Sequence, residues 1–183
     1  MDLLEAEKIY IANSEAARNM EPSVEWKEPG FNLEKTLNDT RGPIIEIAGP
    51  TPFYKQLQNL DAIKKPIFVS NLTPGDPLYN PFTGEYLGVH GTVDFQADAR
   101  KLPVENKSVG AILASCLPAN IVVDTVNEID RVVEDSGLVI WQGVKYDTAA
   151  DIQHRGFAVK HYQEFRTSQG TINNYVFKRE MKG

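Results

Sequence analysis

The chain has 183 residues, a length typical of one domain. Its composition, 42% hydrophobic and 24% charged, is that of a soluble globular protein and unlike that of disordered or disulfide-stapled chains. The net charge is −6, and the basic residues cluster no further than pairs such as Lys64-Lys65 and Arg100-Lys101. The sequence shows no clustered basic patch that would attract a nucleic-acid backbone, so we expect no nucleic-acid partner.

Three features favour a cytoplasmic protein without a membrane segment. The one cysteine, Cys116, cannot form an intrachain disulfide. The opening MDLLEAEK lacks the basic region and apolar run of a secretion signal. The most apolar window, residues 110–119, is half as long as the ~20 residues that a membrane-spanning helix needs.

We expect residues 1–183 to form a single domain, with an N-terminal helical segment over 1–42 and an α/β core over 43–183. Apolar residues at helical spacing predict an amphipathic helix over 3–20, which the sequence EPSVEWKEPG then breaks. A short second helix is predicted to begin after Asn32, a good N-cap.

From Pro43 onward, short apolar runs alternate with helical patterns, the rhythm of a parallel sheet. Helices are predicted over 52–60, over 121–134 with Gly137 as the residue that ends it, and over 147–154. The last two predicted strands, 157–166 and 172–179, are expected to pair as an antiparallel hairpin. The predicted strands are 44–48, 67–71, 93–98, 111–116, 138–143, 157–166 and 172–179.

Residues 72–91 interrupt this rhythm. The stretch has three prolines and four glycines where a helix could have crossed the sheet, so we expect a loop. Tyr79, Tyr86 and His90 are its candidate substrate-binding or lid residues, and an ordered connection without such a role is the alternative.

In open α/β sheets ligands bind beyond the carboxyl ends of the strands, near the point where the strand order reverses. The first four predicted strands end in polar or small residues that would meet at this edge. These ends are Glu46-Ile47-Ala48-Gly49-Pro50-Thr51, Ser70-Asn71-Leu72, Ala97-Asp98-Ala99 and Ser115-Cys116-Leu117.

Two longer segments carry a family resemblance. The block VDFQADARKLPVENKSVGAILAS (93–115) has an acidic residue, then Leu-Pro, a polar turn with Ser, and an apolar strand. The segment EIDRVVEDSGLVIWQG (128–143) is similar to a Glu-x-x-Arg-Val-Leu-x-Pro-Gly-Gly motif. In their order and spacing, residues 43–177 resemble the class I S-adenosylmethionine-dependent methyltransferases. The resemblance implies a doubly wound, mostly parallel, seven-stranded Rossmann-like sheet with helices on both faces and a C-terminal antiparallel hairpin.

The resemblance also implies a cofactor site for S-adenosylmethionine. The turn formed by Ala48, Gly49, Pro50 and Thr51, together with Glu46, matches the glycine-rich motif beside the methionine part. Asn71 and Leu72 fall where the family binds the ribose. Asp98 and Ala99 match the adenine position, and Ser115, Cys116 and Leu117 would lie beneath the sulfonium.

The chain departs from the family pattern at several of these positions. Ala48, Pro50 and Pro52 replace glycines, Gly110 replaces an acidic residue, and residues 135–137 replace Pro-Gly-Gly. The two prolines donate no N–H, so the turn cannot hold a pyrophosphate as a dinucleotide-binding turn does. Adenosylmethionine carries no phosphate and is affected less.

Each candidate also has a purely structural interpretation. Gly49 could serve a tight connection, Asn71 could form a turn, Asp98 could cap one, and Cys116 could be a small buried hydrophobe. The histidines His90, His154 and His161 show no metal-ligand spacing, so no metal site is predicted.

The resemblance predicts a methyltransferase acting on a small molecule or a protein side chain. Methyl transfer is an in-line displacement that depends mainly on positioning, so the absence of a visible catalytic motif is compatible with it. One alternative is an inactive methyltransferase-like binding or interaction module, and another is a scaffold that binds the cofactor for different chemistry. Nothing in the sequence pattern indicates an oligomeric state.

Overall fold

The computed structural model describes most of the predicted core. The described residues are 25–26, 30–49, 63–72, 77–79, 86–89, 93–115, 117–167 and 170–180. The predicted helices over 3–20 and 52–60 lie outside them.

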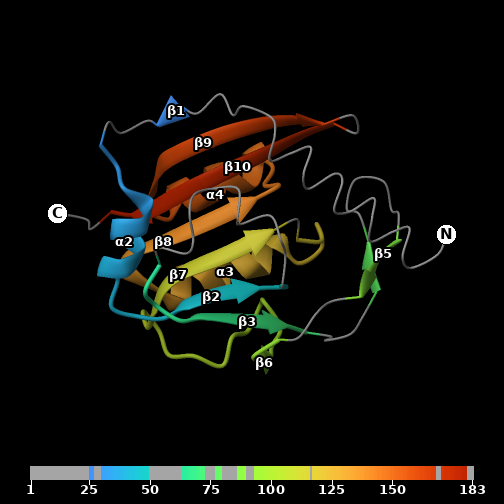
Figure 1. Cartoon of the computed structure of the whole chain (residues 1–183), viewed down its shortest axis with the longest axis horizontal. Coiled ribbons are helices and arrows are strands. Elements are labelled where there is room, and N and C mark those ends of the chain that lie inside the picture. The colour runs from blue at the N-terminus through green and yellow to red at the C-terminus, as the bar shows by residue number, and fades with distance from the viewer. Residues whose placement is uncertain are drawn as a thin grey trace.

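One large sheet organises the described chain (Figure 1), with the strand order β1-β9-β10-β8-β7-β2-β3-β6. A separate antiparallel pair is formed by β4 (Pro77–Tyr79) and β5 (Tyr86–Val89). The strands of the large sheet are β1 (Glu25–Trp26), β2 (Ile44–Ile47), β3 (Ile67–Asn71), β6 (Phe95–Gln96), β7 (Val109–Ser115), β8 (Val133–Gln142), β9 (Phe157–Thr167) and β10 (Gly170–Arg179).

The predicted fold class is confirmed. The strands β6, β3, β2, β7 and β8 pair in parallel, and β10 pairs antiparallel with both β8 and β9. All seven predicted strands are present, and β1 adds a two-residue eighth strand at the β9 edge. The region 1–42, predicted as helical, therefore also contributes a strand.

Side-chain alternation divides the sheet into two apolar faces. We call the face that packs on α2 (Leu33–Asp39) the front face, and the other the back face. The back face packs on α3 (Val122–Val132) and α4 (Tyr146–His154), which lie behind the sheet in Figure 1. In β2 the residues alternate between the two faces and all four are buried, because helices flank the sheet on both sides.

Local signals account for the helix boundaries. Asn32 caps α2 as predicted, since its side chain accepts a hydrogen bond of 2.8 Å from the Lys35 amide. Gly156, with φ +89°, follows α4 in the left-handed conformation that ends many helices. No helix in the described ranges is long and apolar enough to cross a membrane.

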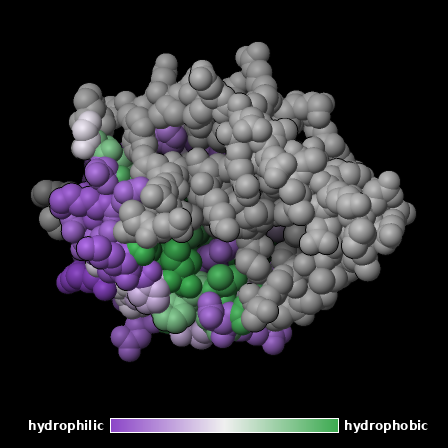
Figure 2. Space-filling model, viewed as in Figure 1, coloured by the Kyte–Doolittle hydropathy of each residue, from purple (hydrophilic) through white to green (hydrophobic). Residues whose placement is uncertain are grey.

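Figure 2 shows the molecule from the same side as Figure 1. Hydrophilic residues gather over α2, and an apolar area lies beside them toward the centre, at the place of β2 and β3. In β3, Phe68 is 40% exposed. The chain passes from β6 to β7 without a helix.

Two predicted features are wrong. Gly137 does not end α3, which stops at Val132, and it lies within β8 instead. A Cβ there would lie 2.8 Å from the Gly110 carbonyl oxygen, so close packing and not capping requires the glycine. The stretch 72–91 is not only loop, because it contains β4 and β5, whose tyrosines and aliphatic residues favour strands.

Gly110 lies at a crowded place on the amino edge of the sheet. Its amide donates to the Pro43 carbonyl at 2.8 Å, and the chain from Thr40 to Gly42 passes directly over it. The Glu134 carboxylate fixes this segment by accepting hydrogen bonds from the backbone amides of Arg41 and Gly42, both at 2.9 Å.

Gly110→Ala should lower the free energy of unfolding by about 2 kcal/mol or more, because its Cβ would lie 2.5 Å from the Gly42 carbonyl oxygen. Gly30→Ala is the control. Its Cβ would meet nothing within 4 Å, so this variant should lose only the stability, about 1 kcal/mol, that backbone strain at φ +84° costs a residue with a Cβ. Urea denaturation measures both, and equal losses would contradict the packing explanation.

Candidate functional site

The carboxyl ends of β2, β3, β6 and β7 meet at one edge of the sheet, as predicted (Figure 1). Ile47 is in register with Ser70 on one side and with Ala114 on the other. The chain leaves β2 toward β3 and later returns to β7 on the opposite side, so the strand order reverses at β2. This is the position at which open α/β sheets bind ligands.

The turn after β2 begins with a left-handed residue. Ala48 adopts φ +58°, in the left-handed region that glycine favours. Gly49 is buried, and a Cβ on it would lie 2.5 Å from the Glu46 carboxylate, so that side chain folds directly against the turn. The contact is with the end of a flexible side chain, so an alanine at position 49 would require Glu46 to move.

Residues of β3 hold this turn in place. The Asn71 side-chain amide donates to the Gly49 carbonyl at 2.8 Å, and the Gly49 amide donates to the Ser70 carbonyl at 3.0 Å. The Ser70 hydroxyl donates to the Glu46 carbonyl at 3.1 Å. Asn71 is 5% exposed, so it supports the turn from within, whereas Leu72 beyond it is 47% exposed at the edge.

Asp98, the candidate adenine-binding residue, is bonded to Arg100. Its Oδ1 accepts from the Arg100 amide and Nε, both at 2.9 Å, and its Oδ2 accepts from Nη2 at 2.6 Å and Nε at 3.1 Å. The Arg100 hydrogen bonds hold the pKa of Asp98 below its ordinary value. The carboxylate therefore caps a turn, and Ala99 beside it is buried.

The other predicted site residues are placed less completely. Ser115 ends β7 at the same edge, and Leu117 packs against the back-face core. Tyr79 and Tyr86 are register partners in the β4–β5 pair, which lies off the carboxyl ends of the strands in Figure 1. Pro50, Thr51, Cys116 and His90 lie outside the described residues.

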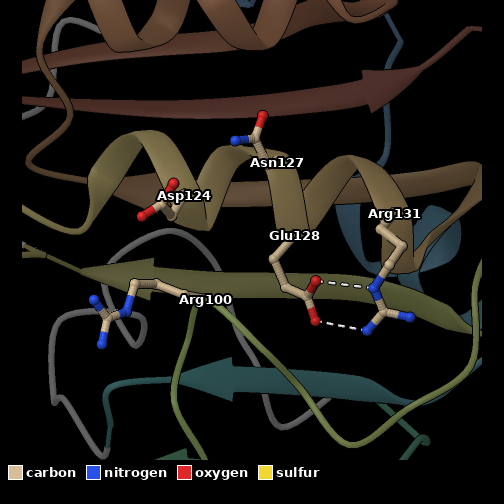
Figure 3. A pocket seen from close by; sticks show the side chains of 5 residues that line it. All are labelled: Arg100, Asp124, Asn127, Glu128 and Arg131. Carbon is tan, nitrogen blue, oxygen red and sulfur yellow. Dashed lines mark hydrogen bonds and ion pairs between the residues drawn. The ribbon is translucent and has the colours of Figure 1, made fainter.

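A hollow of about 450 Å³ lies elsewhere, against α3 (Figure 3). Glu128 and Arg131 in its wall form what we call the clasp. The Glu128 carboxylate accepts from the Leu102 amide at 2.6 Å and from Arg131 Nη2 at 2.6 Å, and the Arg131 hydrogen bonds lower its pKa. Arg131 also donates to the carbonyls of Leu102, at 3.1 Å, and Val104, at 2.9 Å.

The clasp joins the two segments that carry the family resemblance. The Glu-x-x-Arg pair of one segment binds the backbone of the Leu-Pro turn of the other. Both side chains of the clasp are therefore engaged with the chain itself. No group of three or more potential metal ligands occurs in the described part of the chain.

Sequence reasoning missed Arg100 as the partner of Asp98. The two residues are two positions apart around a turn, and this spacing was the available signal. It is weak, because nothing in a sequence shows whether a neighbouring arginine bonds to the carboxylate or extends into solvent.

Comparisons with known proteins identify the fold. No family model matches the chain, and no curated protein matches it. Among solved structures, it resembles a SAM-dependent methyltransferase of Methanosarcina mazei, with a TM-score of 0.52, 8% identity and coverage of 83% of this chain and 99% of that one. It also resembles a Bacillus halodurans protein assigned as a methyltransferase, with a TM-score of 0.52, 9% identity and coverage of 80% of this chain and 97% of that one.

A third solved structure covers the whole chain. It concerns the conversion of a disulfide bond into a thioacetal group during echinomycin biosynthesis, and it matches with a TM-score of 0.52 and 10% identity over 100% of this chain and 94% of that one. The chain has the fold of the class I S-adenosylmethionine-dependent methyltransferases.

Ala48→Gly should raise the free energy of unfolding by about 0.5 kcal/mol, because relief of left-handed strain outweighs the entropy that glycine adds to the unfolded chain. Ala150→Gly, at an exposed position of α4, should instead lower it by about 1 kcal/mol. Chemical denaturation of both variants tests this. If both variants had a lower free energy of unfolding than the parent, Ala48 would not be strained.

Glu128→Gln should destabilise the protein by about 1–2 kcal/mol at neutral pH, since a charge-assisted hydrogen bond becomes a neutral one. The folded-state pKa of Glu128 lies below the usual 4.5. Its contribution to stability is therefore complete above that value and is lost as the pH falls through the folded-state pKa.

The difference in unfolding free energy between the parent and Glu128→Gln should accordingly shrink as the pH falls below 4.5. Asp135→Asn, at an exposed position, is the control and should show little difference at any pH. A difference for Glu128→Gln that stays constant with pH would contradict the clasp.

Proposed function

We propose that this chain binds S-adenosylmethionine at the carboxyl edge of the sheet and transfers its methyl group to a small molecule or a protein side chain. The observation that carries the proposal is the turn after β2, where Ala48 is left-handed and Gly49 lies directly against Glu46. This turn lies at the reversal point of a sheet with the methyltransferase fold.

The described residues fit such a cofactor at the turn. A left-handed residue followed by a glycine lets the backbone approach a ligand closely, and Asn71 holds that shape by bonding to the Gly49 carbonyl. Glu46 and residues 48–51 would lie along the methionine part, and Asn71 with Leu72 beside the ribose. Ser115, Cys116 and Leu117 would form the floor.

When bound, adenosylmethionine supplies a methyl group that its sulfonium makes electrophilic. The chain's own contribution is to hold the acceptor in line with that group and to exclude water. We assign no catalytic residue, because a base is needed only where the acceptor must lose a proton. The net charge of −6 favours a small molecule or protein over nucleic acid as acceptor.

One observation favours a second candidate, a methyltransferase-like binding module without turnover. A carboxylate offers about four acceptor sites, and Arg100 makes four contacts with the Asp98 oxygens. An adenine amino group would have to displace one of these bonds. A third possibility is that the chain binds the cofactor for other chemistry.

Calorimetric titration with S-adenosylmethionine and S-adenosylhomocysteine tests the proposal. We expect saturable heat with both ligands, and Asp98→Ala should weaken binding ~10-fold or more if the carboxylate contacts adenine. Asp147→Asn, at an exposed position of α4, is the control and should bind as the parent does.

Two outcomes contradict parts of the proposal separately. Absence of heat with both ligands at millimolar concentration would rule out the methyltransferase and favour the binding module. Unchanged affinity in Asp98→Ala would leave the cofactor site intact and show that Asp98 serves only as a turn cap.

A further inference from the structure

A polar row crosses the front face of the sheet near the carboxyl ends of β7 and β8. The preceding row is apolar in its centre, where Leu113, Ile140 and Val176 are register neighbours and each is 2% exposed or less. One step further along the sheet the backbone register joins four polar residues, of which Gln142 and Asn174 are buried; the four are Ser115, Gln142, Asn174 and Gln163.

Asn174 is the centre of this row, and the residue is 1% exposed. Within the described part of the chain, neither Oδ1 nor Nδ2 of its side-chain amide makes a hydrogen bond. An unpartnered buried amide costs about 1–3 kcal/mol. Gln142, its neighbour on β8, is also buried, at 3% exposure.

The strand itself shows what a purely structural solution would be. Val176, two residues further along β10 and on the same face, fills its place in the front-face core with a β-branched side chain. Valine at 174 would fit the strand equally well and leave no polar group unpaired. Native chains break such local rules mainly at functional sites, so the Asn174 amide points to a ligand.

The row lies beside the proposed cofactor. It begins at Ser115, beneath the expected position of the sulfonium, and continues through Gln142 to Asn174. Adjacent strands are about 4.8 Å apart, so Asn174 lies about 10 Å across the sheet from Ser115. A small acceptor whose reacting atom faces the methyl group would reach this row with its other end.

We propose that Gln142 and Asn174 form the acceptor-binding subsite, and that the acceptor is an uncharged molecule with a paired donor and acceptor, such as a lactam, a carboxamide or an N-heterocycle. The proposal rests on the proposed function. A side-chain amide presents a donor beside an acceptor and so matches such an edge with two hydrogen bonds. Both residues are neutral, so an ion buried against them would lack a counter-charge.

The test uses the full chain with ¹⁵N-labelled asparagine and four probes of similar size: 2-pyridone, nicotinamide, benzoate and toluene. Comparison with the spectrum of Asn174→Val assigns the Asn174 side-chain amide. We expect 2-pyridone and nicotinamide to shift this signal and benzoate and toluene to leave it unchanged. Asn174→Val should bind the first two ~10-fold or more weakly, and its melting temperature should equal or exceed that of the parent.

Asn173→Val is the matched control. Asn173 is the adjacent asparagine on the opposite face, where its Oδ1 accepts from the Tyr162 hydroxyl at 3.1 Å. This variant should lose stability and keep probe binding. Gln142→Leu should weaken probe binding as Asn174→Val does.

The subsite is overturned if no probe shifts the Asn174 amide, if Asn174→Val binds 2-pyridone as the parent does, or if benzoate binds best. Failure of the proposed function gives a different result. In that case the lactam and carboxamide still bind in an Asn174-dependent manner, but calorimetry detects no S-adenosylmethionine binding.

Discussion

The pairing of β2 with β3 on one side and β7 on the other is the constraint on which the rest of the structure depends. All four residues of β2 are buried, so neither face of the strand can turn to solvent and the register cannot shift by one residue without burying the wrong set. This register brings the ends of β2, β3, β6 and β7 to one edge and makes β2 the reversal point. The turn containing Ala48 and Gly49 is therefore placed by backbone pairing and not by its own sequence.

The strongest part of the family resemblance belongs to the scaffold. Glu128 and Arg131 bind the Leu102–Val104 turn, so the two most recognisable segments form one clasp between α3 and the chain that leads from β6 into β7. Departures from the family pattern occur both in the turn after β2, at Ala48, and in the scaffold, at Gly110.

Much of the fold was predictable because buried parallel strands have a simple signature, continuous apolar runs separated by helical periodicity. Local capping signals such as Asn32 and Gly156 were equally readable. The errors arose where tertiary contacts decide. Gly137 has the sequence character of a helix end, but the passing Gly110 backbone requires it inside β8. The Arg100 bond to Asp98 and the unpartnered Asn174 amide depend on side-chain placement, which no spacing rule reports.

We infer that a ligand binds at the carboxyl edge of β2, β3, β6 and β7. Backbone ¹H–¹⁵N chemical-shift mapping with S-adenosylhomocysteine tests this inference. We expect perturbed amides at residues 47–49, 70–72, 97–99 and 115–117, with little change along α3 from Asp124 to Arg131. Perturbations confined to the α3 hollow, or no perturbation at saturating ligand, would contradict it.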